Sequence, residues 1–343
     1  MNQPLTIVEF PDNHLAAALF GEHDKHLAQI ETSLGVEIIP RGNRVQISGP
    51  KSARKTAKRI MHDLYTRLES DLEVGMGEVK GALSMAEAPW TDQVESCTPE
   101  MNDGDAIGDE GTHGSVLASD TMIRTKRRVI TPRTPGQAAY IKALHSHELV
   151  FGVGPAGTGK TYVAVAMAAQ KLMDGKVDRI ILSRPAVEAG ERLGFLPGDM
   201  RDKVDPYLRP LYDALYDMMP GDQVAKRLES GEIEVAPLAF MRGRTLSNAY
   251  VILDEAQNCT TTQMKMFLTR LGENSHMIVT GDPSQVDLPL GSQSGLVQAT
   301  DTLSDVKGVA VVRFTNKDVV RHPLVTRIVN AYDGTEDKLI KNK

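Results

Sequence analysis

Residues 148–173 read ELVFGVGPAGTGKTYVAVAMAAQKLM, and this stretch decides the fold of the larger part of the chain. It starts with an apolar run typical of a buried strand, passes through a glycine-rich loop and ends in a helix pattern. Residues 154–161, GPAGTGKT, match the complete G-x-x-x-x-G-K-S/T phosphate-binding pattern. The flanking strand and helix favour a phosphate site over a chance glycine-rich turn. From residue 134 onward, strand, loop and helix patterns repeat, which predicts an α/β fold with a largely parallel sheet.

The loop itself supplies the groups that bind phosphate. Its glycines allow backbone angles that turn successive N–H groups inward, and the helix that follows presents its positive end to an anion. We expect Lys160 to reach the β- and γ-phosphates and to act in catalysis, and the Thr161 hydroxyl to coordinate Mg²⁺. The expected nucleotide-binding residues of the loop are Gly154, Pro155, Ala156, Gly157, Thr158, Gly159, Lys160 and Thr161.

A pair of acids follows a second apolar strand. Residues 250–257 read YVILDEAQ, which places Asp254 and Glu255 at the carboxyl end of that strand, where open α/β sheets bind ligands. Asp254 is expected to hold Mg²⁺ through water, and Glu255 to orient and deprotonate the attacking water. A small-molecule kinase has no need of such a base, so Glu255 favours a nucleoside triphosphatase.

Two glutamines complete the expected site. The strand HMIVTGDPSQ leads to Gln285, which would sense the γ-phosphate or hold the water; ordinary loop polarity is the alternative. Gln137 lies in TPGQAAYIKAL, just before the first strand of the core. Its amide carries a donor and an acceptor together, which suits pairing with the edge of adenine.

Residues 1–72 form a separate compact unit. Their strand and helix patterns follow the order β-α-α-β-β-α, with a hairpin signal at Arg41-Gly42-Asn43. This order resembles a KH nucleic-acid-binding domain. The loop that should read G-x-x-G is Gly21-Glu22-His23-Asp24 here, so an acid replaces the second glycine and weakens the expectation that this loop clamps a nucleic-acid backbone.

Residues 41–59 contain a second candidate for nucleic-acid binding. They contain seven basic residues and no acid. Such a strip either contacts phosphates electrostatically or is simply a solvated helix face. The seven bases are Arg41, Arg44, Lys51, Arg54, Lys55, Lys58 and Arg59.

Residues 73–120 differ from the rest in charge. They hold eleven acids against the single base Lys80, whereas the whole chain carries −6. With seven glycines and no sustained apolar period, the segment predicts a flexible linker, with a short helix in its first half. Trp90 is either a solvent-exposed residue of this linker or an anchor that docks on a domain. The remaining residues, 121–343, form the second domain.

Composition narrows the class of protein further. A net charge of −6 excludes a uniformly basic nucleic-acid coat, and two cysteines exclude a disulfide scaffold. No apolar run reaches the ~18 residues of a membrane helix, and the first residues do not have the pattern of a signal peptide. We therefore expect a cytoplasmic protein without a membrane partner.

Taken together, the motifs resemble one family. The combination GVGPAGTGKTYVAVA, SRPAVEAGERLGFLPGD, KVDPYLRPLYDAL, FMRGRTLSNAYVILDEAQN, QMKMFLTRLG and DVVRHPLV resembles the PhoH family of bacterial ATPases, of the type with a KH-like N-terminal domain. The likeness covers residues 121–335 and, more loosely, 1–72. It implies a RecA-like core, ATP binding and hydrolysis, a link to RNA metabolism and hexameric rings. Some relatives are associated with an endoribonuclease that processes ribosomal RNA.

One core leaves an ATP γ-phosphate exposed to solvent. An arginine that stabilises the transition state would then come from a neighbouring subunit, in a head-to-tail ring. Arg321 in DVVRHPLV is the first candidate, and Arg242 and Arg244 follow; structural ion pairs are the alternative for each. Arg184, Arg192 and Phe195 belong to SRPAVEAGERLGFLPGD, which either contacts single-stranded nucleic acid or lies at a subunit interface.

Three functions remain open from the sequence. The first is a ring-forming, Mg-dependent ATPase that remodels or translocates RNA as a helicase-like motor. The second is a nucleotide-gated adaptor that docks a ribosome-associated endoribonuclease without moving RNA. The third, a small-molecule kinase, is disfavoured by Glu255.

Overall fold

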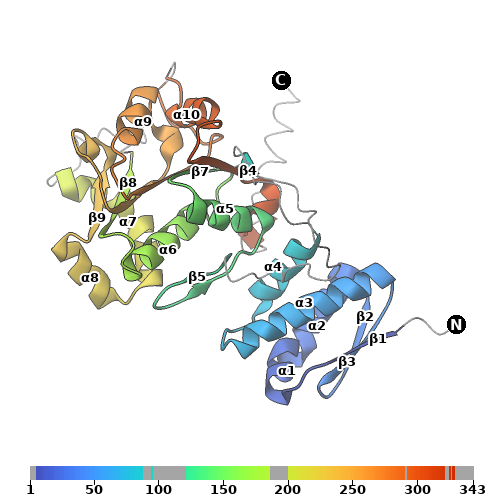
Figure 1. The fold of residues 1–343 in the computed structure, drawn as a ribbon. Helices are drawn as coiled ribbons and strands as arrows, with labels where there is room; N and C mark the ends of the chain where they lie inside the picture. The colour runs from blue at the N-terminus through green and yellow to red at the C-terminus, as the bar shows by residue number, and fades with distance from the viewer. Residues whose placement is uncertain are drawn as a thin grey trace, which may run out of the picture.

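The computed structural model describes residues 5–87, 94–95, 121–185, 200–289, 292–320, 324–325 and 327–328. A small N-terminal domain and a larger core domain lie side by side, joined through helix α4 (Figure 1). The mixed α/β class expected from the sequence is confirmed. Several expected features lie outside the described residues: Trp90, most of the acidic linker, Arg192, Phe195 and Arg321.

The small domain folds in the order β-α-α-β-β-α that its sequence predicts. Its three strands form an antiparallel sheet in the order β1-β3-β2, with Val8 opposite Val45 and Ile38 opposite Ile47. Alternate residues of these strands are buried against the helices. The elements are β1 (Leu5–Glu9), α1 (Asn13–Phe20), α2 (Lys25–Leu34), β2 (Glu37–Arg41), β3 (Arg44–Ser48) and α3 (Lys51–Glu69).

Helix α4 (Met76–Glu87) is the short helix that the sequence predicts in the first half of the linker, and it packs on the small domain. The sequence pattern ends the small domain at residue 72 and begins the linker at 73. In the structure, α4 packs on α2 and α3, and its residues Val79 and Leu83 are buried in the core of the small domain. The hydrophobic core of the small domain thus includes residues of α4.

The core domain is built on a seven-stranded sheet in the order β4-β12-β7-β11-β10-β8-β9. Six strands are parallel, and the short β4 pairs antiparallel with β12 at one edge. The strands are β4 (Val94–Glu95), β7 (Leu149–Val153), β8 (Arg179–Arg184), β9 (Ile233–Pro237), β10 (Ala249–Leu253), β11 (His276–Gly281) and β12 (Val309–Arg313). Strand β11 thus lies between β7, which leads into the phosphate loop, and β10, which precedes the acid pair, as in a RecA-like core.

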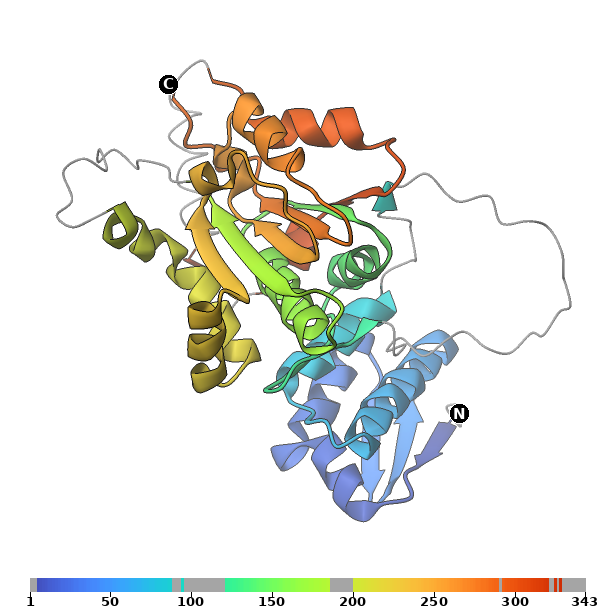
Figure 2. The ribbon, with the colours of Figure 1, turned by 60° about the vertical axis from the view of Figure 1, so that its left-hand side comes forward.

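Helices cover both faces of this sheet (Figures 1 and 2). Successive residues of the central strands alternate between two hydrophobic cores: Val150 and Ile252 face α5, α6, α7 and α8, whereas Phe151 and Val251 face α9 and α10. The helices are α5 (Pro135–Ser146), α6 (Lys160–Met173), α7 (Met200–Met218), α8 (Gly221–Ser230), α9 (Thr261–Leu268) and α10 (Gly295–Leu303).

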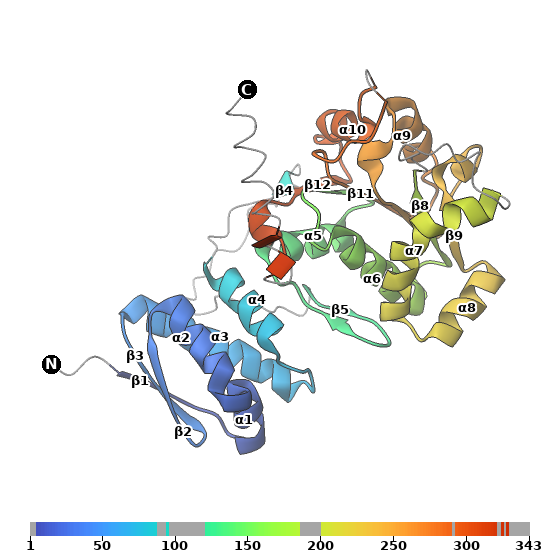
Figure 3. The same ribbon diagram turned by 180° about the vertical axis from the view of Figure 1, so that it is seen from behind.

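A two-stranded hairpin, β5 (Ile123–Arg124) with β6 (Val129–Ile130), precedes α5. Seen from behind, α4 lies between α3 and the core domain, beside the end of this hairpin (Figure 3). Within the described ranges, no helix has the length and apolarity needed to cross a membrane.

Candidate nucleotide site

The loop at residues 154–161 connects β7 directly to the start of α6, the strand–loop–helix arrangement that the sequence predicts. Gly154 has φ 146° and Gly159 has φ 82°, a backbone region that favours glycine. A side chain at Gly154 would also collide with the chain, because its Cβ would lie 2.4 Å from the carbonyl oxygen of Phe314. These glycines allow the loop to close over the N-terminus of α6.

Lys160 points into the loop. Its ammonium group donates to the carbonyl oxygens of Gly154, at 2.6 Å, and Pro155, at 2.7 Å, and contacts the Thr158 hydroxyl at 3.3 Å. The residue is buried, with 8% of its surface exposed. A cation enclosed by a glycine-rich loop at a helix N-terminus produces the positive, donor-rich site that a polyphosphate requires.

Asp254 and Thr161 meet beside the loop. The Thr161 hydroxyl donates to Asp254 Oδ1 at 2.6 Å, and the Thr280 hydroxyl donates to the same oxygen at 2.7 Å. Among the described residues, no group of three or more His, Cys, Asp or Glu side chains gathers as a metal site. One carboxylate and one hydroxyl nevertheless fit Mg²⁺, which prefers oxygen ligands and keeps water and substrate phosphates for its remaining positions.

Glu255 is held by two partners. Its backbone adopts φ 53°, ψ 39°, a left-handed conformation that costs a non-glycine residue about 1 kcal/mol. Its Oε1 pairs with the Arg184 guanidinium at 2.9 Å, and its Oε2 accepts a hydrogen bond from the Gln257 amide at 2.5 Å. The carboxylate is therefore fixed at a strained position next to Asp254.

A cleft begins at these residues. It is lined by Thr161, Arg184, Asp254 and Glu255 on the sheet side and continues over Tyr162 toward helix α7. The metal candidates and the water-activating candidate thus open into one space. Strands β8 and β10 pair in parallel, with Leu253 opposite Ser183. Arg184, at the end of β8, and Asp254, directly after β10, therefore lie side by side at the same edge of the sheet.

Asp282, rather than Gln285, makes the contact between the β11 loop and the phosphate loop. Asp282 Oδ2 accepts from the N–H of Ala156 at 3.2 Å, and its own N–H donates to Gln257 at 3.0 Å. Gln285 is exposed, and its N–H donates to the Asp282 carbonyl at 3.0 Å. Its expected role at the γ-phosphate stays a prediction.

The amide of Gln137, which is expected from the sequence to pair with the edge of adenine, hydrogen-bonds to backbone groups of the protein in this structure. Its Oε1 accepts from the N–H of Arg133 at 2.8 Å, and its Nε2 donates to the carbonyl of Thr158 at 3.0 Å. The residue is 7% exposed. Both ends of the amide are engaged with backbone, so the side chain bridges the start of α5 to the phosphate loop.

The structure distinguishes two of the arginines considered for the role of completing a neighbour's nucleotide site. Arg244 makes a bidentate pair with Glu234, at 2.6 and 2.7 Å, and hydrogen bonding to Glu234 raises its pKa. This is the structural ion pair that stands as the alternative to a role at the nucleotide. Arg242 is exposed at the end of the turn that follows β9, and Arg321, outside the described residues, remains a prediction.

Arg54 also departs from expectation. Instead of joining a phosphate-contacting strip, it is 8% exposed and donates to Gly49 at 3.0 Å and Thr6 at 2.6 Å. It holds helix α3 to the sheet of the small domain. Four other basic residues in the first half of α3 are exposed along one helical face: Lys51, Lys55, Lys58 and Arg59.

Sequence reasoning misses the partners of Glu255. Gln257 stands in the same DEAQ stretch, and its position two residues after Glu255 is the one signal that could have found it. Arg184 is expected either at nucleic acid or at a subunit interface, and nothing local in the sequence relates it to Glu255, which lies 71 positions later. Only the parallel pairing of β8 with β10 brings the two together.

Comparison with known proteins agrees with the motifs. The profile of the PhoH family, described as PhoH-like protein, matches residues 129–333. A PhoH-like protein of Bacillus subtilis is 46% identical over 333 residues, covering 97% of each chain, and one of Mycobacterium tuberculosis is 45% identical over 323 residues, covering 94% of this chain and 86% of that one. Protein PhoH of Escherichia coli is 50% identical over 205 residues, covering 59% of this chain and 58% of its own. Family and site together support a nucleotide-binding, ATPase-like protein, and the chain belongs to the PhoH family.

Proposed function

We propose that this protein binds ATP with Mg²⁺ at residues 154–161 and hydrolyses it, in the service of RNA metabolism in the cytoplasm. The observation that carries the proposal is the joint position of Thr161, Asp254 and Glu255 at one edge of the sheet. The Thr161 hydroxyl lies 2.6 Å from Asp254 Oδ1, and the neighbouring Glu255 opens into the same cleft.

Each residue has a separate task in hydrolysis. Lys160 and the backbone N–H groups of the loop neutralise the phosphate oxygens and hold the γ-phosphate for in-line attack. Thr161, through its hydroxyl, and Asp254, through water, would hold Mg²⁺, which would supply further charge neutralisation on the phosphates. Glu255 accepts a proton from the attacking water, and Arg184 and Gln257 keep its carboxylate in place.

RNA is proposed as the partner because of helix α3. Its exposed basic residues recur along one face of a small domain with KH-like strand order. Such a face attracts phosphates by charge, without reading bases. We further propose that the ATPase cores assemble into a ring, which the family resemblance suggests is hexameric. In this ring a neighbouring subunit completes each nucleotide site, and ATP hydrolysis drives the ring to move or remodel RNA.

The test of the chemistry is the variant Glu255→Gln. It should keep ATP binding and lose hydrolysis by about 10²-fold or more, since the water loses its base while the phosphate loop stays intact. Lys160→Ala should instead weaken nucleotide binding itself. Turnover is measured as phosphate release, and binding by calorimetry with a non-hydrolysable ATP analogue. Near-wild-type turnover in Glu255→Gln would remove Glu255 from the mechanism.

The test of the RNA role is turnover with and without RNA, on protein of known oligomeric mass. Stimulation by single-stranded RNA supports an RNA-driven motor. Turnover that ignores RNA, in protein that binds nucleotide normally, would instead support the adaptor that docks an endoribonuclease.

A further inference from the structure

Gln137 connects the phosphate loop to the segment of residues 131–133, which leads into helix α5. The amide spans the two through bonds of 2.8 Å to the Arg133 N–H and 3.0 Å to the Thr158 carbonyl. Thr158 is fully buried, and its hydroxyl donates to the Pro155 carbonyl at 3.0 Å. The buried Gln137 side chain is therefore a direct hydrogen-bonded link between the 131–133 segment and the loop.

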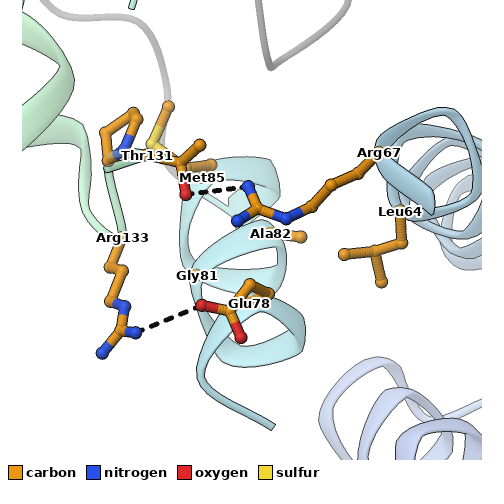
Figure 4. A pocket seen from close by; sticks show the side chains of 9 residues that line it. Leu64, Arg67, Glu78, Gly81, Ala82, Met85, Thr131 and Arg133 are labelled. Carbon is orange, nitrogen blue, oxygen red and sulfur yellow. Dashed lines mark hydrogen bonds and ion pairs between the residues drawn. The ribbon is translucent and has the colours of Figure 1, made fainter. Parts of the chain in front are cut away.

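The same segment is held by the small domain. Arg67, near the end of α3, donates to the Thr131 hydroxyl at 2.9 Å, and Glu78 of α4 pairs with the Arg133 guanidinium at 3.1 Å (Figure 4). Arg67 is 8% exposed, and burial lowers its pKa while Glu78 opposes that change. The two domains thus share a charged contact that is partly removed from water.

The backbone of α4 also approaches this segment closely. A Cβ at Gly81 would lie 3.1 Å from Arg133 Cα, and one at Gly77 would lie 3.2 Å from the carbon of the Arg133 guanidinium. Glycine at these two helical positions lets α4 lie directly against Arg133. Glycine in a helix interior costs about 1 kcal/mol relative to alanine, so the contact is kept at a cost in helix stability.

We propose that Gln137 is a positioning residue for the phosphate loop, and that the small domain sets its position through Glu78 and Arg133. The docking of α4 then determines how well the loop is formed for nucleotide. By linkage, nucleotide binding in turn stabilises the docking of the small domain. The inference rests on the proposed nucleotide site.

The first test is a double-mutant cycle in the full chain, with the affinity for Mg-ADP measured by calorimetry. Glu78→Gln should weaken binding by about 3- to 10-fold, and Gln137→Met by at least as much. If the effects pass through the same connection, the double variant should be no weaker than Gln137→Met alone. Arg133→Lys, which retains the charge pair, should stay within about twofold of wild type.

A matched control lies on the same domain. Glu9 pairs with Arg44 at 3.1 Å on the far side of the sheet, so Glu9→Gln breaks a more exposed ion pair of the same domain without touching α4. It should leave the affinity unchanged. Gly81→Ala provides a second perturbation of the junction, and should weaken Mg-ADP binding although alanine favours the helix. If the fold-losses in Mg-ADP affinity of Glu78→Gln and Gln137→Met simply multiply in the double variant, the proposal is overturned.

A readout without nucleotide separates this inference from the proposed function. Amide hydrogen exchange over residues 154–161 should accelerate at least about threefold in Glu78→Gln and stay at the wild-type rate in Glu9→Gln. A wild-type protein that fails to bind Mg-ADP would refute the nucleotide site, and the coupling would then be judged on exchange alone. Exchange unchanged by both Glu78→Gln and Gly81→Ala would refute the coupling.

Discussion

At the scale of single residues, the pair between Arg184 and Glu255 ties the end of β8 to the end of β10. The guanidinium contacts Oε1 at 2.9 Å and leaves Oε2 to Gln257. A carboxylate fixed by two partners at a strained backbone position loses little freedom when it meets the attacking water. Arg184 is therefore a positioning residue for the proposed base.

Arg184→Ala should lower kcat by about 10- to 100-fold with little change in KM for ATP, because a misplaced base affects the chemical step more than binding. Arg227→Ala is the control, since Arg227 pairs with Glu232 away from the cleft. Steady-state phosphate release over a range of ATP concentrations separates the two constants. Faster turnover in Arg184→Ala would mean that the pair restrains Glu255 instead of presenting it.

Cys259 shows how burial controls reactivity near the site. It lies fully buried after the acid pair, and burial raises the pKa of its thiol to about 12. The thiolate is the reactive form, so at about pH 8 the folded chain should resist alkylation at this residue. Unfolding returns the pKa to about 8.5. Folding stability should therefore decline as pH rises from about 8.5 toward 12, since the unfolded chain loses the thiol proton first.

The check is mass spectrometry of the peptide that contains Cys259, after treatment with iodoacetamide with and without denaturant. Modification is expected only in denaturant. Rapid modification of the native protein would show that the region opens readily, and would contradict the buried position of the thiol.

At the scale of elements, helix α3 has two faces with different roles. Arg54, on its buried side, bonds to Gly49 and Thr6 and fastens the helix to the sheet. Arg67, near its end, contacts Thr131 of the core domain. The exposed side carries Lys51, Lys55, Lys58 and Arg59. A run of bases that is uniform in the sequence is thus divided by helical geometry into structural and surface residues.

Changing the four exposed bases of α3 to glutamine should weaken RNA binding by about 10-fold or more at low salt. It should also flatten the dependence of log K on log salt, by about 0.7 for each RNA phosphate that the variant no longer neutralises. The control changes four exposed lysines of the core domain, which are Lys142, Lys226, Lys265 and Lys307. Affinity is measured by fluorescence anisotropy with single-stranded RNA at several salt concentrations. An unchanged slope would assign the face to solvent or protein.

The sequence predicts those features that depend on residues close together in the chain, and it misses contacts between residues far apart. The loop at 154–161 and the acid pair at 254–255 are local patterns, and each lies at the strand end that its neighbours indicate. The short helix predicted in the first half of the linker is present as α4, but the sequence pattern does not indicate that Gly77 and Gly81 bring it against Arg133. Arg184 meets Glu255 through the parallel pairing of β8 with β10, and Gln137 meets Thr158 across 21 residues of sequence, so short-range patterns contain neither contact.

At the scale of the whole molecule, the described site lies in one core domain and opens into a cleft between the sheet and α7. Within the described residues, Arg184 is the arginine that lines this cleft, and it is already paired with Glu255. Arg244 is committed to Glu234. In the proposed ring, the arginine that completes the site comes from a neighbouring subunit, with Arg321 as first candidate and Arg242 next.

Mixing two inactive variants tests this proposal. Arg321→Ala subunits should bind ATP normally and be inactive alone, and Lys160→Ala subunits should bind it poorly. In mixed rings, an interface with an intact loop from the first variant and an intact arginine from the second is a complete site, so activity should reappear. An arginine finger contributes about 10³–10⁵ in rate, so even a minority of repaired interfaces should exceed the background.

The mixing requires subunit exchange, so the two proteins are dissociated, recombined and checked by native mass before the assay. An arginine acting within its own subunit allows no rescue, because every subunit in the mixture lacks one essential part. Absence of rescue in verified mixed rings would therefore exclude Arg321 as a residue acting between subunits. The same experiment with Arg242→Ala then decides whether the other exposed candidate takes that role, or whether the core works without a neighbour's arginine.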